Sequence, residues 1–273
     1  SSLPLLHKRY PGFDESDEQF MIEKTNEVAE EIQKHVNAMY NIYAKRFHNV
    51  TKHRFQIKQE YVAKSGLWIA KKRYAQWVIF KEGKPTDKLD IKGLDIIRSS
   101  FPEDFKKIMK EALWFILKEK NKQETTDLIM NFKNKIKDSQ VLNVMKNSGV
   151  KNITKYTKGR KPFGPYMSGT PAHVKSAINY NDLIRNSGTK VFACLLDGEK
   201  VKWAYLTTNP YGFDTMALRG YADLPEIIEF VETYIDRNKI FARELKGKLD
   251  DFYAALGWQS VPESNNMNKF FSF

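Results

Sequence analysis

The sequence lacks several features that would assign it to a common class of secreted, membrane or enzyme protein. Its single cysteine, Cys194, excludes an internal disulfide and a cysteine-based metal site. There is no run of about 18 apolar residues, and the first residues lack the charged-then-apolar order of a signal peptide. We therefore expect an intracellular protein.

Familiar catalytic motifs are missing as well. The sequence contains no glycine-rich Walker loop, no nucleophile elbow and no Ser/His/Asp order. No second ligand lies at metal spacing from His173, so we predict no zinc site and interpret His173 as structural or as facing a nucleic acid. Glu60, which shares a face of a predicted strand with Lys58, is either a carboxylate near a metal site assembled elsewhere or a salt-bridge partner.

The chain does contain enough apolar residues to form a core, and it has a large excess of cationic residues. Of its 273 residues 41% are hydrophobic, and the formal net charge is +12. Aromatic residues make up 13% of the chain and supply surface on which bases can stack. This combination favours a nucleic-acid-binding protein over one that binds an acidic membrane surface.

The periodicities predict an α+β fold in two parts, with a boundary near residue 105. Before it, apolar residues spaced by three or four from Val28 to Phe47 predict a long helix, and alternation predicts antiparallel strands over 54–62 and 67–80. After it, we expect a mostly helical part with an ordered loop over 151–172 and a β-hairpin over 191–206. The helices of that part are predicted over 102–122, 125–137, 227–234 and 240–256.

The most informative segment places cations directly after an apolar strand. The run 67–70 leads into Lys71, Lys72, Arg73 and Tyr74, and a second basic segment begins at Lys92. On a strand, Lys72 and Tyr74 would project to one face, and Lys71 and Arg73 to the other. Because burying an unpaired cation is costly, we expect an anionic partner such as a phosphate backbone. The alternative is a solvated strand edge protected by lysines.

Two further segments carry candidate binding residues. The loop from residue 151 to 161 gathers cations around a tyrosine and could follow a phosphate backbone, the alternative being a flexible basic loop. At the end of the chain, four large apolar residues follow a polar tail and predict docking in a groove on a partner, the alternative being weak packing on the chain itself. The terminal residues are Met267, Phe270, Phe271 and Phe273.

Taken together, these segments resemble family B DNA polymerases of the T-even phage type. The run 71–75, Lys-Lys-Arg-Tyr-Ala, and the run 92–95, Lys-Gly-Leu-Asp, are similar to two motifs at the end of that family's palm. The run 171–174, Pro-Ala-His-Val, with Tyr180 and Asn181, resembles its thumb motif. The terminal residues resemble its sliding-clamp peptide, so the resemblance spans most of residues 50–273.

The resemblance implies a partial palm over residues 1–105, a thumb over 106–260 and a clamp-binding tail over 261–273. It also implies that residues 71–74 hold primer-template DNA near the growing 3′ end, while the loop up to His173 grips upstream duplex. The DNA-binding residues so implied are Lys71, Lys72, Arg73, Tyr74, Lys92, Lys155, Tyr156, Lys158, Arg160, Lys161 and His173.

The sequence departs from the family in its catalytic segments. Neither Asp-x-x-Ser-Leu-Tyr-Pro nor Tyr-Gly-Asp-Thr-Asp-Ser is present, and these carry the aspartates that hold Mg²⁺ for phosphoryl transfer in the family. We therefore expect no catalytic residue in this chain, no polymerase activity from it alone, and a separate N-terminal half that supplies the aspartates and binds most of the Mg²⁺.

Ser1 suggests how the two halves could be joined. A serine can follow an intein, and the residues after it resemble those that follow Tyr-Gly-Asp-Thr-Asp-Ser in the family, so we hypothesise a splice junction at Ser1. An engineered or proteolytic fragment is the alternative. The resemblance implies a role in the cytoplasm of an infected bacterial host. Two other interpretations stay open, namely a free-standing basic module for duplex DNA or RNA and a structural RNA-binding protein of a virion.

Overall fold

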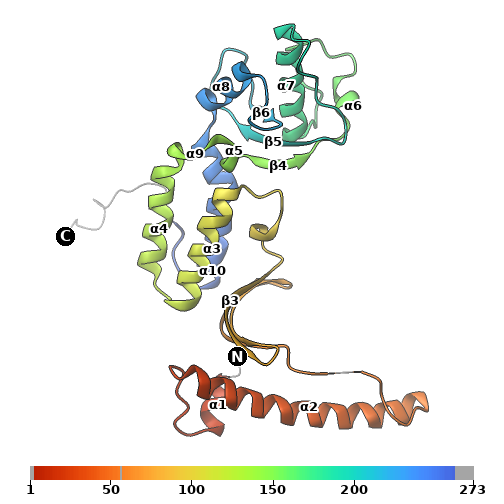
Figure 1. Cartoon of the computed structure of the whole chain (residues 1–273), viewed down its shortest axis with the longest axis vertical. Helices are drawn as coiled ribbons and strands as arrows, with labels where there is room; N and C mark the ends of the chain where they lie inside the picture. The colour runs from red at the N-terminus through yellow and green to blue at the C-terminus, as the bar shows by residue number, and fades with distance from the viewer. Residues whose placement is uncertain (1–2, 56, 262–273) are drawn as a thin grey trace, which may run out of the picture. The chain divides into compact units, whose positions relative to one another are not determined.

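The computed structural model describes residues 3–55 and 57–261 and divides into two compact units (Figure 1). Unit 1 comprises the described residues of 1–66 together with 75–91, and unit 2 comprises 67–74 together with the described residues from 92 onward. This division passes through a sheet and does not follow the single boundary expected near residue 105. All the described residues that the sequence assigns to DNA binding fall in unit 2.

Two helices begin unit 1. After the short helix α1 (Leu3–Arg9), α2 (Glu18–His48) starts at Asp17, whose carboxylate accepts a hydrogen bond from the backbone N–H of Phe20 at 2.9 Å. Asn49 ends α2 in the left-handed conformation at φ 55°. The long helix predicted from the spacing of apolar residues is therefore confirmed.

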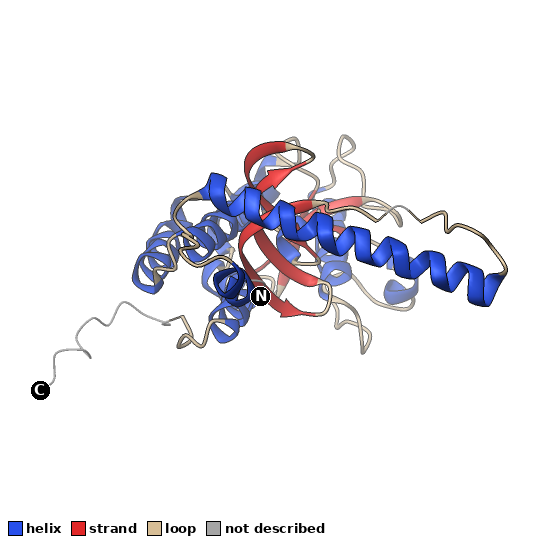
Figure 2. Cartoon of the chain, turned by 90° about the horizontal axis from the view of Figure 1, so that it is seen from below, coloured by secondary structure: helices blue, strands red, loops and turns tan. Residues whose placement is uncertain are grey.

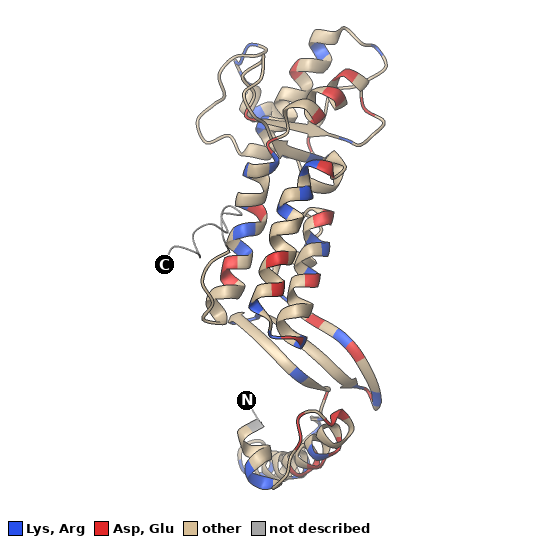
Figure 3. Cartoon of the chain, turned by 90° about the vertical axis from the view of Figure 1, so that its left-hand side faces the viewer, with Lys and Arg blue, Asp and Glu red and all other residues tan. Residues whose placement is uncertain are grey.

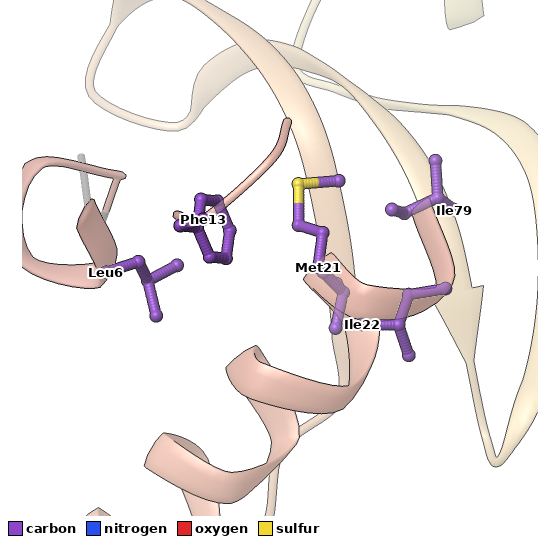
Figure 4. Close-up of a cluster of buried hydrophobic side chains, with 6 residues drawn as sticks. Leu6, Phe13, Met21, Ile22 and Ile79 are labelled. Atoms are coloured by element: carbon purple, nitrogen blue, oxygen red, sulfur yellow. The ribbon is translucent and has the colours of Figure 1, made fainter. Parts of the chain in front are cut away.

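The core of unit 1 is small and lies at the start of α2. Six buried side chains form it, drawn from α1, the loop after it, the first turns of α2 and two strands (Figure 4). They are Leu6, Phe13, Met21, Ile22, Val62 and Ile79. Partly buried Val28 and Trp77 pack against them, so only the first third of α2 is held by this core.

Three strands follow α2 and pair in the order β1-β2-β3. They are β1 (Tyr61–Ala70), β2 (Arg73–Lys81) and β3 (Lys84–Lys92), joined by two-residue turns that make neighbours antiparallel. The strand predicted over 54–62 is wrong for its described residues before Tyr61. Just before this segment, the backbone N–H of His53 donates to the side chain of Asn41 on α2 at 3.1 Å.

Helices form the first part of unit 2. The helix α3 (Glu103–Lys118) buries its predicted apolar stripe against α4 (Lys122–Lys135). A continuous helical stretch formed by α9 (Arg237–Ile240), the π-helical segment η3 (Phe241–Lys246) and α10 (Gly247–Ala255) lies beside them (Figure 1). This unit also contains three short helical turns: η1 (Asp95–Ile97) before α3, and η2 (Ile136–Asp138) and α5 (Val141–Val144) after α4.

A second sheet forms the rest of unit 2. Its order is β4-β5-β6, from β4 (Lys146–Gly149), β5 (Lys200–Tyr205) and β6 (Thr215–Leu218), all antiparallel. Helix α7 (Ala172–Ser187) packs on it, chiefly against β6. Two smaller helices complete the unit, α6 (Ile153–Thr157) and α8 (Pro225–Tyr234).

The hairpin predicted over 191–206 is wrong in its first arm. Residues 191–196 form no strand, and β5 pairs with β4 and β6 instead. The cause is Asn181 of α7, whose side-chain amide donates to the carbonyl of Leu195 at 3.0 Å and accepts from its N–H at 2.6 Å. A side chain thus satisfies the backbone groups that a partner strand would have used. The loop predicted over 151–172 likewise contains α6.

With helices and two antiparallel sheets, the α+β fold class is confirmed. Within the described part of the chain, no helix combines the length and the apolar character that crossing a bilayer requires.

Candidate nucleic-acid interface

Lys71 and Lys72 form the turn between β1 and β2 and do not lie within a strand. Both side chains are exposed, and Lys72 adopts a left-handed backbone at φ 62°. The strand alternation expected for these two lysines is therefore wrong, because both project from the turn. A turn presents cations farther from the sheet than a pleated strand does, and neither lysine has an ion-pair partner among the described residues.

The second basic segment packs directly against this turn. Gly93 has φ +65°, and a Cβ atom at that position would lie 2.1 Å from the backbone carbonyl oxygen of Lys72. Only glycine fits there, because any side chain would clash with a backbone atom that cannot move aside. The contact brings the motif at 71–74 and the motif at 92–95 together in unit 2.

Aromatic rings and an ion pair flank the turn. Trp68 is 59% exposed, and its ring lies 6.4 Å from the ring of Tyr74. Arg73 faces Asp251 of α10 across 3.6 Å, which partly neutralises its charge. Lys92, at the end of β3, is exposed. Among the described residues at this end of unit 2, Lys71 and Lys72 are thus exposed cations without an ion-pair partner.

From Gly93 the chain runs into a groove. Leu94 and Ile96 are each 1% exposed and fix η1 in the unit. The carbonyls of Ser99 and Ser100 then accept hydrogen bonds from the side chain and backbone of Asn147, at 2.9 and 3.2 Å. These bonds attach the end of the 92–100 segment to β4.

The groove has a volume of about 610 Å³ and brings five distant segments together. It is lined by Ser99, Ser100, Asn147, Ser148, Gly149, His173, Lys200, Val201, Lys202 and Arg219. Lys200 is exposed and has no ion-pair or hydrogen-bond partner in the described structure. Hydroxyls, amide groups and cations of this kind are the groups that proteins use to hold nucleic-acid phosphates.

Burial lowers two basic pKa values in the groove. The pKa of His173 lies below its ordinary 6.5, because the imidazole is partly buried and Lys146 lies nearby. The pKa of Lys202 is lowered chiefly by burial, and its ammonium group donates to the carbonyl of Leu142 at 2.7 Å. At neutral pH, His173 therefore contributes a neutral hydrogen-bonding ring and not a cation.

Arg219 is the other cation of the groove, and it is fully engaged in holding the fold. Its guanidinium donates to Glu199, to the hydroxyl of Tyr180 and to two backbone carbonyls. The Tyr180 hydroxyl in turn donates to Asp223 at 2.7 Å, and burial followed by this carboxylate raises the pKa of Tyr180. Tyr180 and Asn181 thus fix the shape of the region and do not face solvent.

The basic loop before α7 is held by one buried ion pair. Arg160 donates to the carboxylate of Asp182 at 2.8 Å, with side-chain exposures of 5% and 1%. The same carboxylate accepts the N–H of Phe163 at 3.0 Å. Arg160 was expected to contact DNA, but the structure places it inside the protein as an anchor for the loop.

Around that anchor, the loop presents its other cations to solvent. Lys155, Lys158 and Lys161 are exposed, and Lys155 lies 5.2 Å from the ring centre of Tyr156. Across unit 2, Lys and Arg are interspersed with Asp and Glu (Figure 3). A cation is therefore available to a ligand where its side chain has no acidic partner, and the net charge alone does not identify such cations.

The sequence analysis did not predict that Lys200, Ser99 and Ser100 line one groove together with His173. Ser99 and Ser100 lie in the basic segment that the sequence singled out, but no local signal connects them with β4 or β5. Lys200 follows a turn signal and gives no other indication. Only the pairing of β4 with β5 brings Gly149 opposite Lys200.

The residues present do not fit a catalytic metal site. Among the described residues, no group of three or more His, Cys, Asp or Glu side chains is placed to hold a metal ion. Glu60 is exposed and precedes β1. Ser1 and the terminal residues Met267, Phe270, Phe271 and Phe273 lie outside the described residues.

Exposed cations on a turn, a polar groove and a basic loop, all within one unit of an α+β chain, are features typical of proteins that bind polyanions. The chain belongs to DNA polymerase family B, whose family model matches residues 18–207. It is 28% identical over 190 residues to the DNA-directed DNA polymerase of Escherichia phage RB69. The matched region is 67% of this chain but 20% of that protein, so the chain spans about a fifth of the length of this curated relative.

Proposed function

We propose that this chain grips primer-template duplex DNA as part of a family B DNA-directed DNA polymerase that replicates phage DNA. The contact between Gly93 and the carbonyl of Lys72 carries the proposal. It joins the two basic motifs in one unit, and the chain then leads without a break to the groove that contains His173. Family membership supplies the identity of the polyanion.

Each group of residues on this surface has its own role in holding the duplex. Lys71 and Lys72 reach the duplex backbone from their turn, with Tyr74 and Trp68 beside them as apolar contacts. Lys200 and the serines of the groove hold phosphates farther along the duplex, and Lys158 and Lys161 add contacts from the basic loop. Such contacts position a duplex without reading its sequence, which is the requirement for a replicative enzyme.

The proposal assigns catalysis to another polypeptide. The aspartates and the Mg²⁺ are supplied by a separate N-terminal half, residues 1–105 and 106–260 act as the end of the palm and the thumb, and the terminal residues from Met267 to Phe273 dock on a sliding clamp. The complex would act in the cytoplasm of an infected bacterial cell. The splice junction at Ser1 stays a sequence-based prediction.

DNA binding by the chain alone is the first test. Fluorescence anisotropy of a labelled primer-template across a salt series should give a slope that falls by about one unit in Lys72→Ala, because one phosphate contact is lost. Lys110→Ala is the matched control, since Lys110 is exposed on α3 and outside the proposed surface. A slope that is unchanged in Lys72→Ala, or equally reduced in the control, contradicts the proposal.

Primer extension then separates the polymerase from a free-standing binding module. The chain is mixed with a candidate N-terminal half, dNTPs and Mg²⁺, and each component is also assayed alone. Extension only in the mixture supports the proposal. DNA binding without extension in any mixture favours the module for duplex DNA or RNA.

A further inference from the structure

The second part of α2 carries an apolar stripe that is open to solvent. Its members recur at the three-to-four spacing that places side chains on one face of a helix. Ile32 is 57% exposed, Met39 41%, Tyr43 50% and Phe47 62%. Contiguous apolar surface of this extent is unusual on a soluble monomer and marks an interaction site.

Unit 1 covers a different face of this helix. The segment that returns from the end of α2 runs back along the helix (Figure 2). It lies over the polar residues Gln33, Asn37 and Asn41, bonded through Asn41 and separated from the helix by a gap of about 600 Å³. The polar face of α2 is therefore covered, and its apolar face is exposed to solvent. In a folded protein an amphipathic helix normally buries its apolar face and exposes its polar face.

We propose that this stripe is the docking surface for the polypeptide that carries the part of the family B polymerase that the present chain does not match. The family match begins at residue 18, the first residue of α2, so the helix lies inside the family domain. About four fifths of the relative's length has no counterpart in this chain. The identity of the partner rests on the proposed function, whereas the open stripe does not.

The experiment uses the full chain and, as the probe, the polypeptide from the same genome that carries the remaining family sequence. Isothermal titration calorimetry measures their affinity for the wild-type chain, Tyr43→Asp and Val191→Asp. Val191 is 85% exposed in unit 2 and outside the stripe, so it is the matched control. We expect Tyr43→Asp to weaken binding by about 30-fold or more, as for an aromatic hot spot, and Val191→Asp to change it by less than about twofold. Circular dichroism checks that both variants keep the wild-type helix content.

Several results would overturn the assignment. They are equal affinities for wild type and Tyr43→Asp, no binding of the probe by the wild-type chain, or self-association of the wild-type chain that Tyr43→Asp abolishes, which would make a second copy the occupant. Binding to vesicles of anionic phospholipid that Tyr43→Asp abolishes would assign the stripe to a membrane.

Primer-template anisotropy on the same variants keeps this proposal separate from the proposed function. Tyr43→Asp should bind DNA like the wild type, because the proposed DNA surface lies in unit 2. Unchanged partner affinity with normal DNA binding rejects the docking surface alone. Partner binding that responds to Tyr43→Asp, in a chain that does not bind DNA, rejects the proposed function alone.

Discussion

Helices α2 and α7 are buried to very different degrees, and only α2 was predicted from the spacing of its apolar residues. Of the 31 residues of α2, only Met21, Ile22 and Ala44 are buried. Of the 16 residues of α7, ten are buried, including the polar side chains of Asn179, Asn181 and Asp182. In α2 apolar side chains are exposed, and in α7 polar side chains are buried. The spacing of apolar residues thus shows which face of a helix can be buried, whereas packing against the rest of the protein decides which face is buried.

The largest effect should come from the buried carboxylate of α7. In Asp182→Ala the guanidinium of Arg160 remains buried without its partner, which typically costs about 3 to 5 kcal/mol. Urea unfolding followed by tryptophan fluorescence measures the loss. Arg185→Ala is the control, because Arg185 lies 3.8 Å from the same carboxylate but is 56% exposed. It should cost less than about 1 kcal/mol, and a similar loss in both variants would show that Asp182 acts without Arg160.

The same substitution in both helices tests the comparison directly. Ile178 of α7 is 1% exposed and Ile42 of α2 is 64% exposed. Ile178→Ala should lower the free energy of unfolding by about 2 to 5 kcal/mol through the lost packing and the cavity, whereas Ile42→Ala should change it by less than about 0.5 kcal/mol. Denaturant unfolding of the chain alone measures both. If Ile42→Ala is as costly as Ile178→Ala, this part of α2 is covered in solution by the chain itself or by a second copy.

Gly93 extends the comparison from side chains to backbone packing. Gly93→Ala puts a methyl group against the carbonyl of Lys72 at a left-handed position, and we expect a loss of about 2 to 3 kcal/mol together with weaker DNA binding. Gly220→Ala is the control, since a Cβ atom there meets nothing within 4 Å. Unfolding and anisotropy measure the two effects. A stable Gly93→Ala variant with normal affinity would mean that the turn at Lys72 does not depend on this contact.

The sequence predicted the fold where a signal is local. The apolar stripes of α2 and α3 each depend on residues a few positions apart, and these helices are confirmed. The strand expected before Tyr61 and the first arm of the hairpin before β5 were both wrong. In the hairpin arm the side chain of Asn181 takes the backbone N–H and carbonyl of Leu195 that would have paired in a sheet.

The residues of the candidate site likewise divide into those that a local sequence pattern predicts and those that it does not. Exposed Lys71 and Lys72 could be predicted, because three successive cations after an apolar strand are poorly suited to a core. The burial of Arg160 could not, since its partner lies 22 residues later on a helix that turns it inward. The groove could not be predicted either, because Ser100, His173 and Lys200 meet only once β4 has paired with β5.

The smallest expected effect concerns His173, in the first turn of α7. Burial and then Lys146 lower the pKa of this imidazole below 6.5. The unfolded chain therefore binds a proton on His173 more readily than the folded chain does. The stabilisation due to the neutral ring is complete above about pH 6.5, and it is lost as the pH falls from there through the lower pKa of the folded protein. His173→Gln should reduce this dependence slightly, and an NMR titration of the imidazole should give a midpoint below 6.5.

The same pKa makes a prediction about DNA binding. At pH 7.5 the ring is neutral, so His173→Gln should leave the salt slope of binding unchanged, whereas Lys200→Ala should lower it by about one unit. Below the lowered pKa of the folded protein the imidazole takes up its proton and adds a cation to the groove, and the slope of the wild type should then exceed that of His173→Gln. If the two proteins have equal slopes both at pH 7.5 and below the midpoint found by NMR, the ring does not face a phosphate, and the groove binds DNA through Lys200 and the serines alone.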